Sequence, residues 1–83
     1  MIRAKIIIRL KPDVFDPEAS ALGKSLRGLG FHEVIDARIA RVIELNLATE
    51  EETSLYARIQ AMAEGLLANS VLEDYEIELE TNL

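Results

Sequence analysis

One histidine and four serines are the residues of this chain that could support nucleophilic catalysis. Such catalysis needs a serine hydroxyl within reach of a base, and the base needs a third group to orient it. His32 follows Phe31 after a predicted helix end, and no serine stands beside it in the sequence. The serines are Ser20, Ser25, Ser54 and Ser70. The pattern provides no completed triad and favours a structural role for His32.

The neighbouring carboxylates Glu73 and Asp74 are the candidates for general acid–base chemistry, because they directly follow a predicted helix end. We favour a solvated or hydrogen-bonded connection at this point over a catalytic pair. The acidic residues lack the spacing of a calcium loop, and a chain with no cysteine and one histidine offers no thiolate or histidine metal site. The stretch KPDVFDPE after the first predicted strand contains no glycine that could build a phosphate-binding loop.

The first half of the chain predicts a strand and then a helix. Residues 2–10 alternate apolar and basic side chains, which is typical of a strand with one buried face. Asp16 is a good N-cap, Pro17 suits the first helical position, and Gly30 is a good C-cap. The apolar stripe of this helix is Leu22, Leu26 and Leu29.

The middle of the chain predicts two further strands, residues 33–40 and 42–48. A short turn near Ala40-Arg41 would join them as a hairpin or as one long bent ribbon. Thr49 and Glu52 then have the spacing of a capping box at the start of a second helix. We expect this helix to end near Asn69 in the left-handed conformation, with an apolar stripe of Leu55, Ile59, Met62 and Leu66.

The last predicted strand places Tyr75, Ile77 and Leu79 on one face and Glu76, Glu78 and Glu80 on the other. The order β-α-β-β-α-β predicts an α+β, ferredoxin-like two-layer sandwich, with a four-stranded antiparallel sheet and two helices on one face. The first and last strands would then be antiparallel neighbours. Their basic and acidic side chains would face each other, which explains the acidic alternation without catalysis.

Composition sets further limits on the function. The chain has 83 residues, of which 49% are hydrophobic, and we expect one domain spanning residues 1–83. A core of this size is often completed by association with another chain. The net charge of −6 argues against nucleic acid and anionic membranes as partners. Charges interrupt the apolar run MIRAKIIIRL, so we expect no signal peptide and a cytoplasmic protein.

Three stretches together resemble the PurS family, the small subunit of phosphoribosylformylglycinamidine synthase in purine biosynthesis. They are DPEASAL at 16–22, VIDARIARVIEL at 34–45 and LLANSVLEDYEIEL at 66–79. The resemblance covers essentially the whole chain, and the last stretch is the most specific. Two positions depart from the family pattern, since Ala19 and Ala40 stand where members often have glycine.

The resemblance implies a subunit with no catalytic residues and no cofactor of its own, within a complex that uses ATP and magnesium. Such a chain would self-associate as a dimer or tetramer and join a large synthetase subunit and a glutaminase subunit. Ammonia released from glutamine would then reach the ATP-activated formylglycinamide ribonucleotide. We predict that the segments 34–47 and 69–75 carry the subunit contacts. The predicted interface residues are Arg38, Arg41, Asn69, Asp74 and Tyr75.

Two other functions remain open from the sequence. The first is an ACT-like regulatory domain, which has the same order of elements and binds a small molecule at a dimer interface. Such domains commonly place a glycine-rich turn after the first strand, and this chain lacks one. The second is a free-standing enzyme, which would need a completed catalytic constellation.

Overall fold

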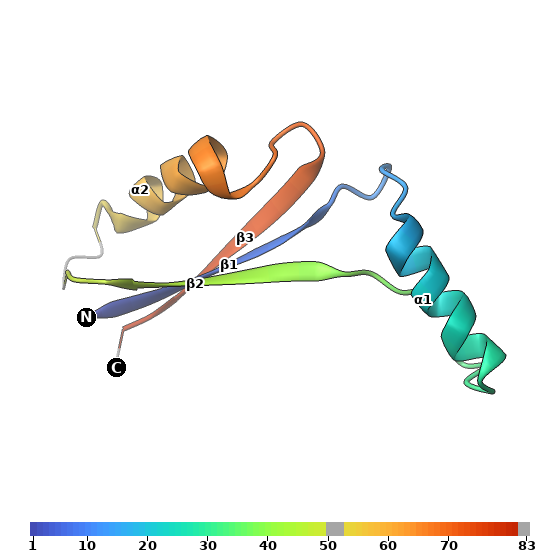
Figure 1. Ribbon diagram of the computed structural model, residues 1–83. Helices are drawn as coiled ribbons and strands as arrows, with labels where there is room; N and C mark the ends of the chain where they lie inside the picture. Colours follow the sequence, from blue (N-terminus) through green and yellow to red (C-terminus); the bar gives the residue numbers. More distant parts are fainter. Residues whose placement is uncertain (50–52, 82–83) are drawn as a thin grey trace.

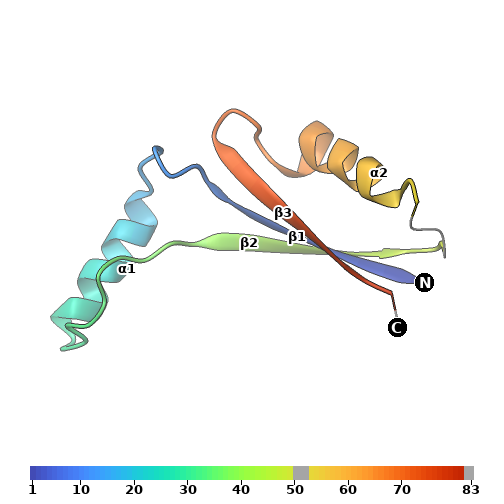
Figure 2. The same ribbon diagram turned by 180° about the vertical axis from the view of Figure 1, so that it is seen from behind.

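The computed structural model describes residues 1–49 and 53–81 of the chain. The elements within these ranges are β1 (Ile2–Leu10), α1 (Pro17–Gly28), β2 (Ala40–Leu47), α2 (Leu55–Met62), the π-helical turn η1 (Ala63–Leu67) and β3 (Glu73–Glu80). The described strands form one antiparallel sheet in the order β2-β1-β3. Helix α2 covers one face of this sheet, whereas α1 lies beyond the end of the sheet (Figure 1), as the view from behind also shows (Figure 2).

The core lies between the central strand β1 and helix α2. Alternate side chains of β1 are almost completely buried, and they are Ile2, Ala4, Ile6 and Ile8. Leu55, Ile59 and Ala63 pack against them from the helical layer. The predicted strand over residues 2–10 is therefore confirmed, together with its apolar face.

The predicted antiparallel pairing of the first and last strands is also confirmed. The register places Lys5 opposite Glu78, but the Lys5 ammonium lies 3.1 Å from the carboxylate of Glu80. The Arg9 guanidinium lies 2.8 Å from Glu76, which is likewise two residues along β3 from Asp74, the residue opposite Arg9. Such diagonal pairs remain within reach of long side chains across a sheet. The acids of β3 are thus used to pair with the bases of β1.

Helix α1 begins and ends as its sequence predicts. The Asp16 carboxylate accepts a hydrogen bond from the Ala19 N–H at 3.1 Å, and Pro17 occupies the first turn. Gly30 has a φ of 103°, the left-handed region that glycine adopts without a steric penalty. Local signals therefore determine both ends of this helix.

The predicted position of α1 over the sheet is wrong for the single chain. Leu22 is 44% exposed and Leu29 is 75% exposed, because α1 covers neither face of the sheet. The Lys11 N–H bonds the Leu72 carbonyl at 2.9 Å, which keeps the chain in line with β1 past its last residue. The chain then turns outward. We call residues 11–39 the arm, and the three strands with α2 and η1 the body.

The predicted fourth strand and hairpin are not formed within the chain. Residues 33–39 belong to no strand, and β2 is a single strand that begins at Ala40. Ala40 and Arg41 lie within this strand, so the predicted turn between them is wrong. The Arg27 guanidinium donates to the carbonyls of Val34 and Ile35 at 3.2 and 3.1 Å. These bonds hold the segment along α1.

The second helix differs from its prediction at its C-terminal end. The predicted capping box includes Glu52, which lies outside the described residues. The Ala68 N–H bonds the Ala63 carbonyl five residues earlier at 2.8 Å, which is the bond of a π-helical turn. The wide turn brings Ala63 onto the sheet and leaves Leu66 86% exposed, so the predicted apolar stripe is wrong at Leu66. Asn69 does not adopt the left-handed conformation.

The described chain is elongated. Its radius of gyration is 16.3 Å, whereas a compact chain of this length has about 12 Å. None of the helices in the described ranges has the length and apolar character needed to cross a membrane. The cytoplasmic location and the single domain stay predictions.

Candidate functional site

A hydrogen-bond network joins β2, the end of η1 and the start of β3. One terminal nitrogen of Arg41 lies 3.2 Å from each carboxylate oxygen of Glu73 and 3.5 Å from the Leu67 carbonyl. The Asn69 N–H donates to Glu73 at 2.8 Å. The Asn69 N–H, and after it Arg41, lower the pKa of Glu73 against the opposing effect of desolvation. Glu73 therefore stays ionised near neutral pH and fastens three elements together.

The turn after η1 is held by the side chain of Asn69. Its amide oxygen accepts from the N–H groups of Val71 and Leu72 at 3.0 and 3.3 Å. The Leu72 carbonyl in turn accepts the hydrogen bond from Lys11 described above. Val71 is 77% exposed and Leu72 is 43% exposed. We call these two residues the apolar tip.

Tyr75 and Asp74 lie on opposite faces of β3. The Tyr75 hydroxyl donates to the Glu64 carboxylate at 2.9 Å, and this bond, with burial, raises the pKa of Tyr75. The tyrosine ring packs against the core from β3. Asp74 stands opposite Arg9 in the sheet register. Neither side chain forms an acid–base pair with Glu73, which is bound to Arg41.

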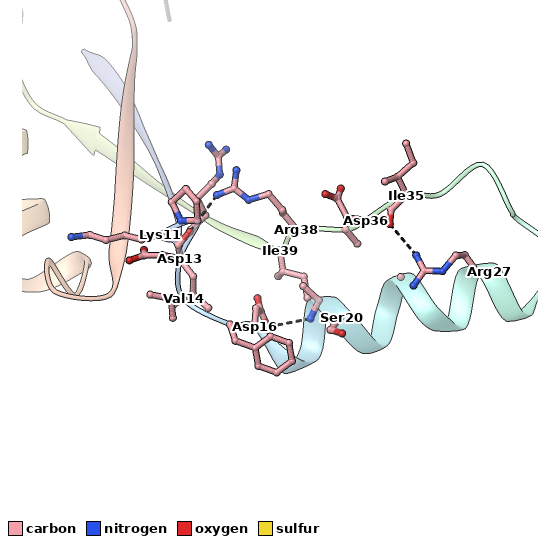
Figure 3. Close-up of a pocket in the computed structure, with 17 residues that line it drawn as sticks. Lys11, Asp13, Val14, Asp16, Ser20, Arg27, Ile35, Asp36, Arg38 and Ile39 are labelled. Carbon is pink, nitrogen blue, oxygen red and sulfur yellow. Dashed lines mark hydrogen bonds between the residues drawn. The ribbon is translucent and has the colours of Figure 1, made fainter.

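Arg38 lies apart from this network, in a cavity of about 690 Å³ inside the arm (Figure 3). The cavity is enclosed by the loop after β1, the first turns of α1 and residues 35–39. Arg38 donates to the Leu10 carbonyl at 3.3 Å, and Arg27 bonds two other backbone carbonyls at the far end of the same segment. Arg38 thus ties the arm to the end of β1, and Arg27 holds the backbone within the arm.

A second hollow, of about 320 Å³, lies between β2 and the helical layer. It is lined by apolar residues alone, and we call it the β2 notch. Its residues are Leu45, Ala61, Met62, Gly65, Leu66 and Leu67. A Cβ added to Gly65 would meet no atom within 4 Å, so this side of the helix is open. The described chain leaves the notch uncovered.

The described polar residues do not assemble a catalytic centre. His32 is exposed in the turn that follows α1. In residues 1–49 and 53–81, no group of three or more histidine or acidic side chains could hold a metal ion. The arrangement leaves apolar and charged surfaces open to solvent.

Comparison with known proteins decides the family. The PurS profile, described as phosphoribosylformylglycinamidine (FGAM) synthase, matches residues 3–81. The phosphoribosylformylglycinamidine synthase subunit PurS of Bacillus subtilis (strain 168) is 38% identical over 80 residues, which cover 96% of this chain and 94% of that protein. This chain belongs to the PurS family. The assignment made from the sequence is confirmed, and the ACT-like alternative gains no support from these matches.

Solved PurS structures match the whole chain. Methanocaldococcus jannaschii PurS, described as one of the subunits of formylglycinamide ribonucleotide amidotransferase in the purine biosynthetic pathway, has a TM-score of 0.90 at 34% identity over 100% of both chains. The C2 crystal form of Bacillus subtilis PurS has a TM-score of 0.85 at 38% identity, over 96% of this chain and 99% of that chain. A score of 0.90 over the full length of both chains includes the arm, so the outward position of α1 is shared.

The structure brings together only part of the interface set predicted for this PurS chain. Arg41 and Asn69 meet through Glu73, and Asp74 and Tyr75 follow on β3, whereas Arg38 lies in the arm. All five stay predictions as contact residues. The sequence analysis missed the apolar tip, although two apolar residues in a turn, where polar residues are usual, were a signal for it.

Proposed function

We propose that this chain is the non-catalytic assembly subunit of a phosphoribosylformylglycinamidine synthase. It would hold the ATP-using synthetase and the glutaminase together, so that ammonia from glutamine reaches the activated formylglycinamide ribonucleotide. The complex uses ATP and magnesium, whereas this chain would bind neither. Family membership supports this role. The observation that carries the assembly part is the outward position of α1, which leaves complementary surfaces open on one chain.

The exposed stripe of α1 supports self-association. The accessible surface of the chain is 5934 Å², whereas a compact chain of 9.3 kDa exposes about 5,000 Å². The difference is close to the area of about 800 Å² that each partner contributes to a stable interface. A second copy that covered the arm would therefore remove about the excess surface.

The β2 notch supplies the complementary surface for α1 of the second copy. It is apolar, it lies beside α2 on the sheet face that α2 covers, and the chain's own α1 does not reach it. Leu22 and Leu29 of one copy would pack against Leu45 and Leu66 of the other, and all four side chains would lose contact with water. The exchange would be reciprocal: α1 of each copy would pack into the β2 notch of the other copy.

The extended segment 33–39 would accompany α1 in this exchange. Strand β2 lies at an edge of the sheet, with one side unpaired in the described chain. Ile35, Ala37 and Ile39 alternate with polar residues, as a half-buried strand requires. Paired with β2 of the second copy, the segment would be a fourth strand. The four-stranded, two-helix sandwich predicted from the sequence would then be built from two chains.

The exchange is tested by placing a charge on the exposed stripe. Leu29→Glu should raise the dissociation constant of the dimer at least about tenfold, because burying an unpaired carboxylate costs more than about 1.4 kcal/mol. Ala21→Glu is the matched control, since it adds the same charge on another side of α1. Sedimentation equilibrium gives both constants. Equal association of the two variants would rule out the exchange.

The assembly role is tested by reconstitution. The purified chain is mixed with the synthetase and glutaminase subunits of the same organism, and glutamine-dependent amidine formation is followed with and without it. We expect activity to require the chain, and the chain alone to have none. Unchanged activity in its absence would refute the proposed function.

A further inference from the structure

We infer that the two-fold axis of the exchanged dimer passes beside Ala40, and that Arg38 of each copy lies next to Glu44 of the other. The partner in this contact is a second copy of this chain. The inference rests on the proposed function, because it specifies the register in which segment 33–39 of one copy pairs with β2 of the other.

The apolar pattern keeps one phase from the end of the arm through β2. Its members are odd-numbered throughout: Ile35, Ala37, Ile39, Ile43, Leu45 and Leu47. A two-residue hairpin at Ala40-Arg41 would pair Ile39 with Val42, and it would turn the apolar side chains of its two strands to opposite faces. The chain instead runs on from β2 toward α1 without turning back (Figure 1), as a pattern of one phase requires.

A strand of one phase can pair with its own copy only in certain registers. Two copies related by a two-fold axis present the same surface to each other, and their paired strands run antiparallel. Residues that stand opposite each other lie on the same face of the sheet, so odd-numbered residues must meet odd-numbered ones. The axis must therefore pass beside a residue and not between two residues.

Like charges exclude two of the candidate positions for the axis. An axis beside Arg38 or Arg41 would place two identical guanidinium groups directly opposite each other, which is destabilising. An axis further along the chain in either direction would leave the apolar ends of the two segments unpaired. Ile39 and Ala40 remain.

The core face of the sheet decides between Ile39 and Ala40. With the axis beside Ile39, Glu33 would stand opposite Leu45, so a carboxylate would face the apolar β2 notch. With the axis beside Ala40, Ile35 stands opposite Leu45 instead. Ile35 is 91% exposed in the single chain, so this register covers the side chain that most needs a partner.

The same register gives Arg38 a partner on the outer face. Arg38 stands opposite Val42 of the other copy and one diagonal step from Glu44, in the same sense as the ion pairs between β1 and β3. Within residues 1–49 and 53–81, Arg38 has no ion-pair partner. Asp36 would stand opposite Glu44, and the Arg38 charge beside both carboxylates offsets their repulsion.

Cross-linking of single cysteines tests the register, because the chain itself contains no cysteine. Two Ala40→Cys chains would have their Cα atoms about 5 Å apart across the axis, a separation that a disulfide spans. Two Val42→Cys chains would be separated by about 13 Å, since each residue stands two positions from the axis. We expect Ala40→Cys to form the covalent dimer at least about tenfold faster than Val42→Cys or Ile39→Cys under mild oxidation.

The extent of cross-linking is read from non-reducing gel electrophoresis of the full chain. Sedimentation equilibrium before oxidation shows whether each variant forms the wild-type dimer. This control separates a change of register from a loss of association.

A double-mutant cycle tests the ion pair. The dimer dissociation constants of Arg38→Ala, Glu44→Ala and the double variant are compared with that of wild type. Because the pair occurs twice about the axis, we expect a coupling of about threefold or more. Arg38→Ala combined with Glu78→Ala is the matched control and should be additive, because Glu78 lies on β3, away from the contact.

The outcomes distinguish the inference from the proposed function. Fastest cross-linking at Ile39 or Val42 would overturn the register, and additive effects at Arg38 and Glu44 would overturn the ion pair. A monomer, or a dimer that cross-links at none of these positions, would refute the exchange as well. The assembly role is measured separately, because amidine formation that does not require the chain would refute that role whatever the register. Fastest cross-linking at Ala40 with coupling between Arg38 and Glu44 supports the inference.

Discussion

The body and the arm of this chain are stabilised in different ways. The body buries alternate side chains of β1 beneath α2 and closes its far end with the Arg41–Glu73 network. The arm has well-formed helix caps and backbone hydrogen bonds, but most of its large apolar side chains face water. Local signals can thus form a helix whose tertiary partner is absent from the same chain.

The contrast between body and arm indicates where a small chain of this kind obtains its stability. Helices as short as α1 are marginal in water without tertiary packing. The body contains a buried core that can unfold cooperatively, whereas the stability of the arm depends on what the arm contacts. Substitutions in the two regions should therefore have separable effects, on folding for the body and on association for the arm.

The largest effect is expected from a cavity in the body. Ile59→Ala removes a fully buried side chain from the core and should destabilise the chain by about 2–5 kcal/mol. Leu29→Ala, in the arm, should change the unfolding free energy of the dissociated chain by less than about 0.5 kcal/mol. Urea denaturation at concentrations below the dimer dissociation constant measures both. Similar losses would mean that the arm belongs to the same cooperative core.

An intermediate effect is expected from the network that closes the body. Glu73→Gln keeps the size of the side chain but removes the charge that Arg41 and Asn69 bind, and should cost about 1–3 kcal/mol. Asp74→Asn is the neighbouring control and should stay within about 0.5 kcal/mol of wild type. Thermal unfolding distinguishes the two. An effect as large at Asp74 as at Glu73 would contradict the role assigned to the network.

The same carboxylate predicts a pH dependence. The pKa of Glu73 is lowered from its usual value near 4.5 in the folded chain, so the stability it contributes is fully present above that value. The contribution is lost as the pH falls through the lower pKa of the folded state. The free energy of unfolding should thus drop more steeply below about pH 4.5 in wild type than in Glu73→Gln. Parallel pH profiles would contradict this assignment.

The smallest effect is expected at the start of the arm. Asp16→Ala removes the N-cap of α1 and should destabilise that helix by about 1 kcal/mol. Amide hydrogen exchange should therefore quicken in α1 while the amides of β1 keep their wild-type protection. Faster exchange throughout the body would show that the two regions unfold together.

The sequence predicted what depends on neighbouring residues. Asp16, Pro17 and Gly30 bound a helix as expected, and the alternation in β1 and β3 defined both strands and their pairing. These features follow from backbone geometry and from one buried face. The charged pairs between β1 and β3 were predicted as well, apart from their diagonal offset.

The sequence could not predict where each element would be placed. Leu22 and Leu29 form an apolar stripe whether the surface they cover belongs to the same chain or to another, so the pattern cannot say which. The alternation at residues 33–39 is likewise consistent with a strand in either chain. The network around Glu73 was missed because its partners, Arg41 and Asn69, meet only after the sheet has formed.

The π-helical turn at Ala63–Leu67 sets the rotational position of the residues that follow it. Its one additional residue changes the rotational phase of everything that follows, so Leu66 faces outward at the notch while Asn69 arrives beside Glu73. Deleting Gly65 would restore α-helical spacing and rotate Leu66 toward the sheet, but it would also draw Asn69 back from the carboxylate it binds. The one additional residue of this turn thus sets both the β2 notch, which is open to a second copy, and the turn that presents the apolar tip. An insertion or deletion within Ala63–Leu67 would disturb the notch and the tip together.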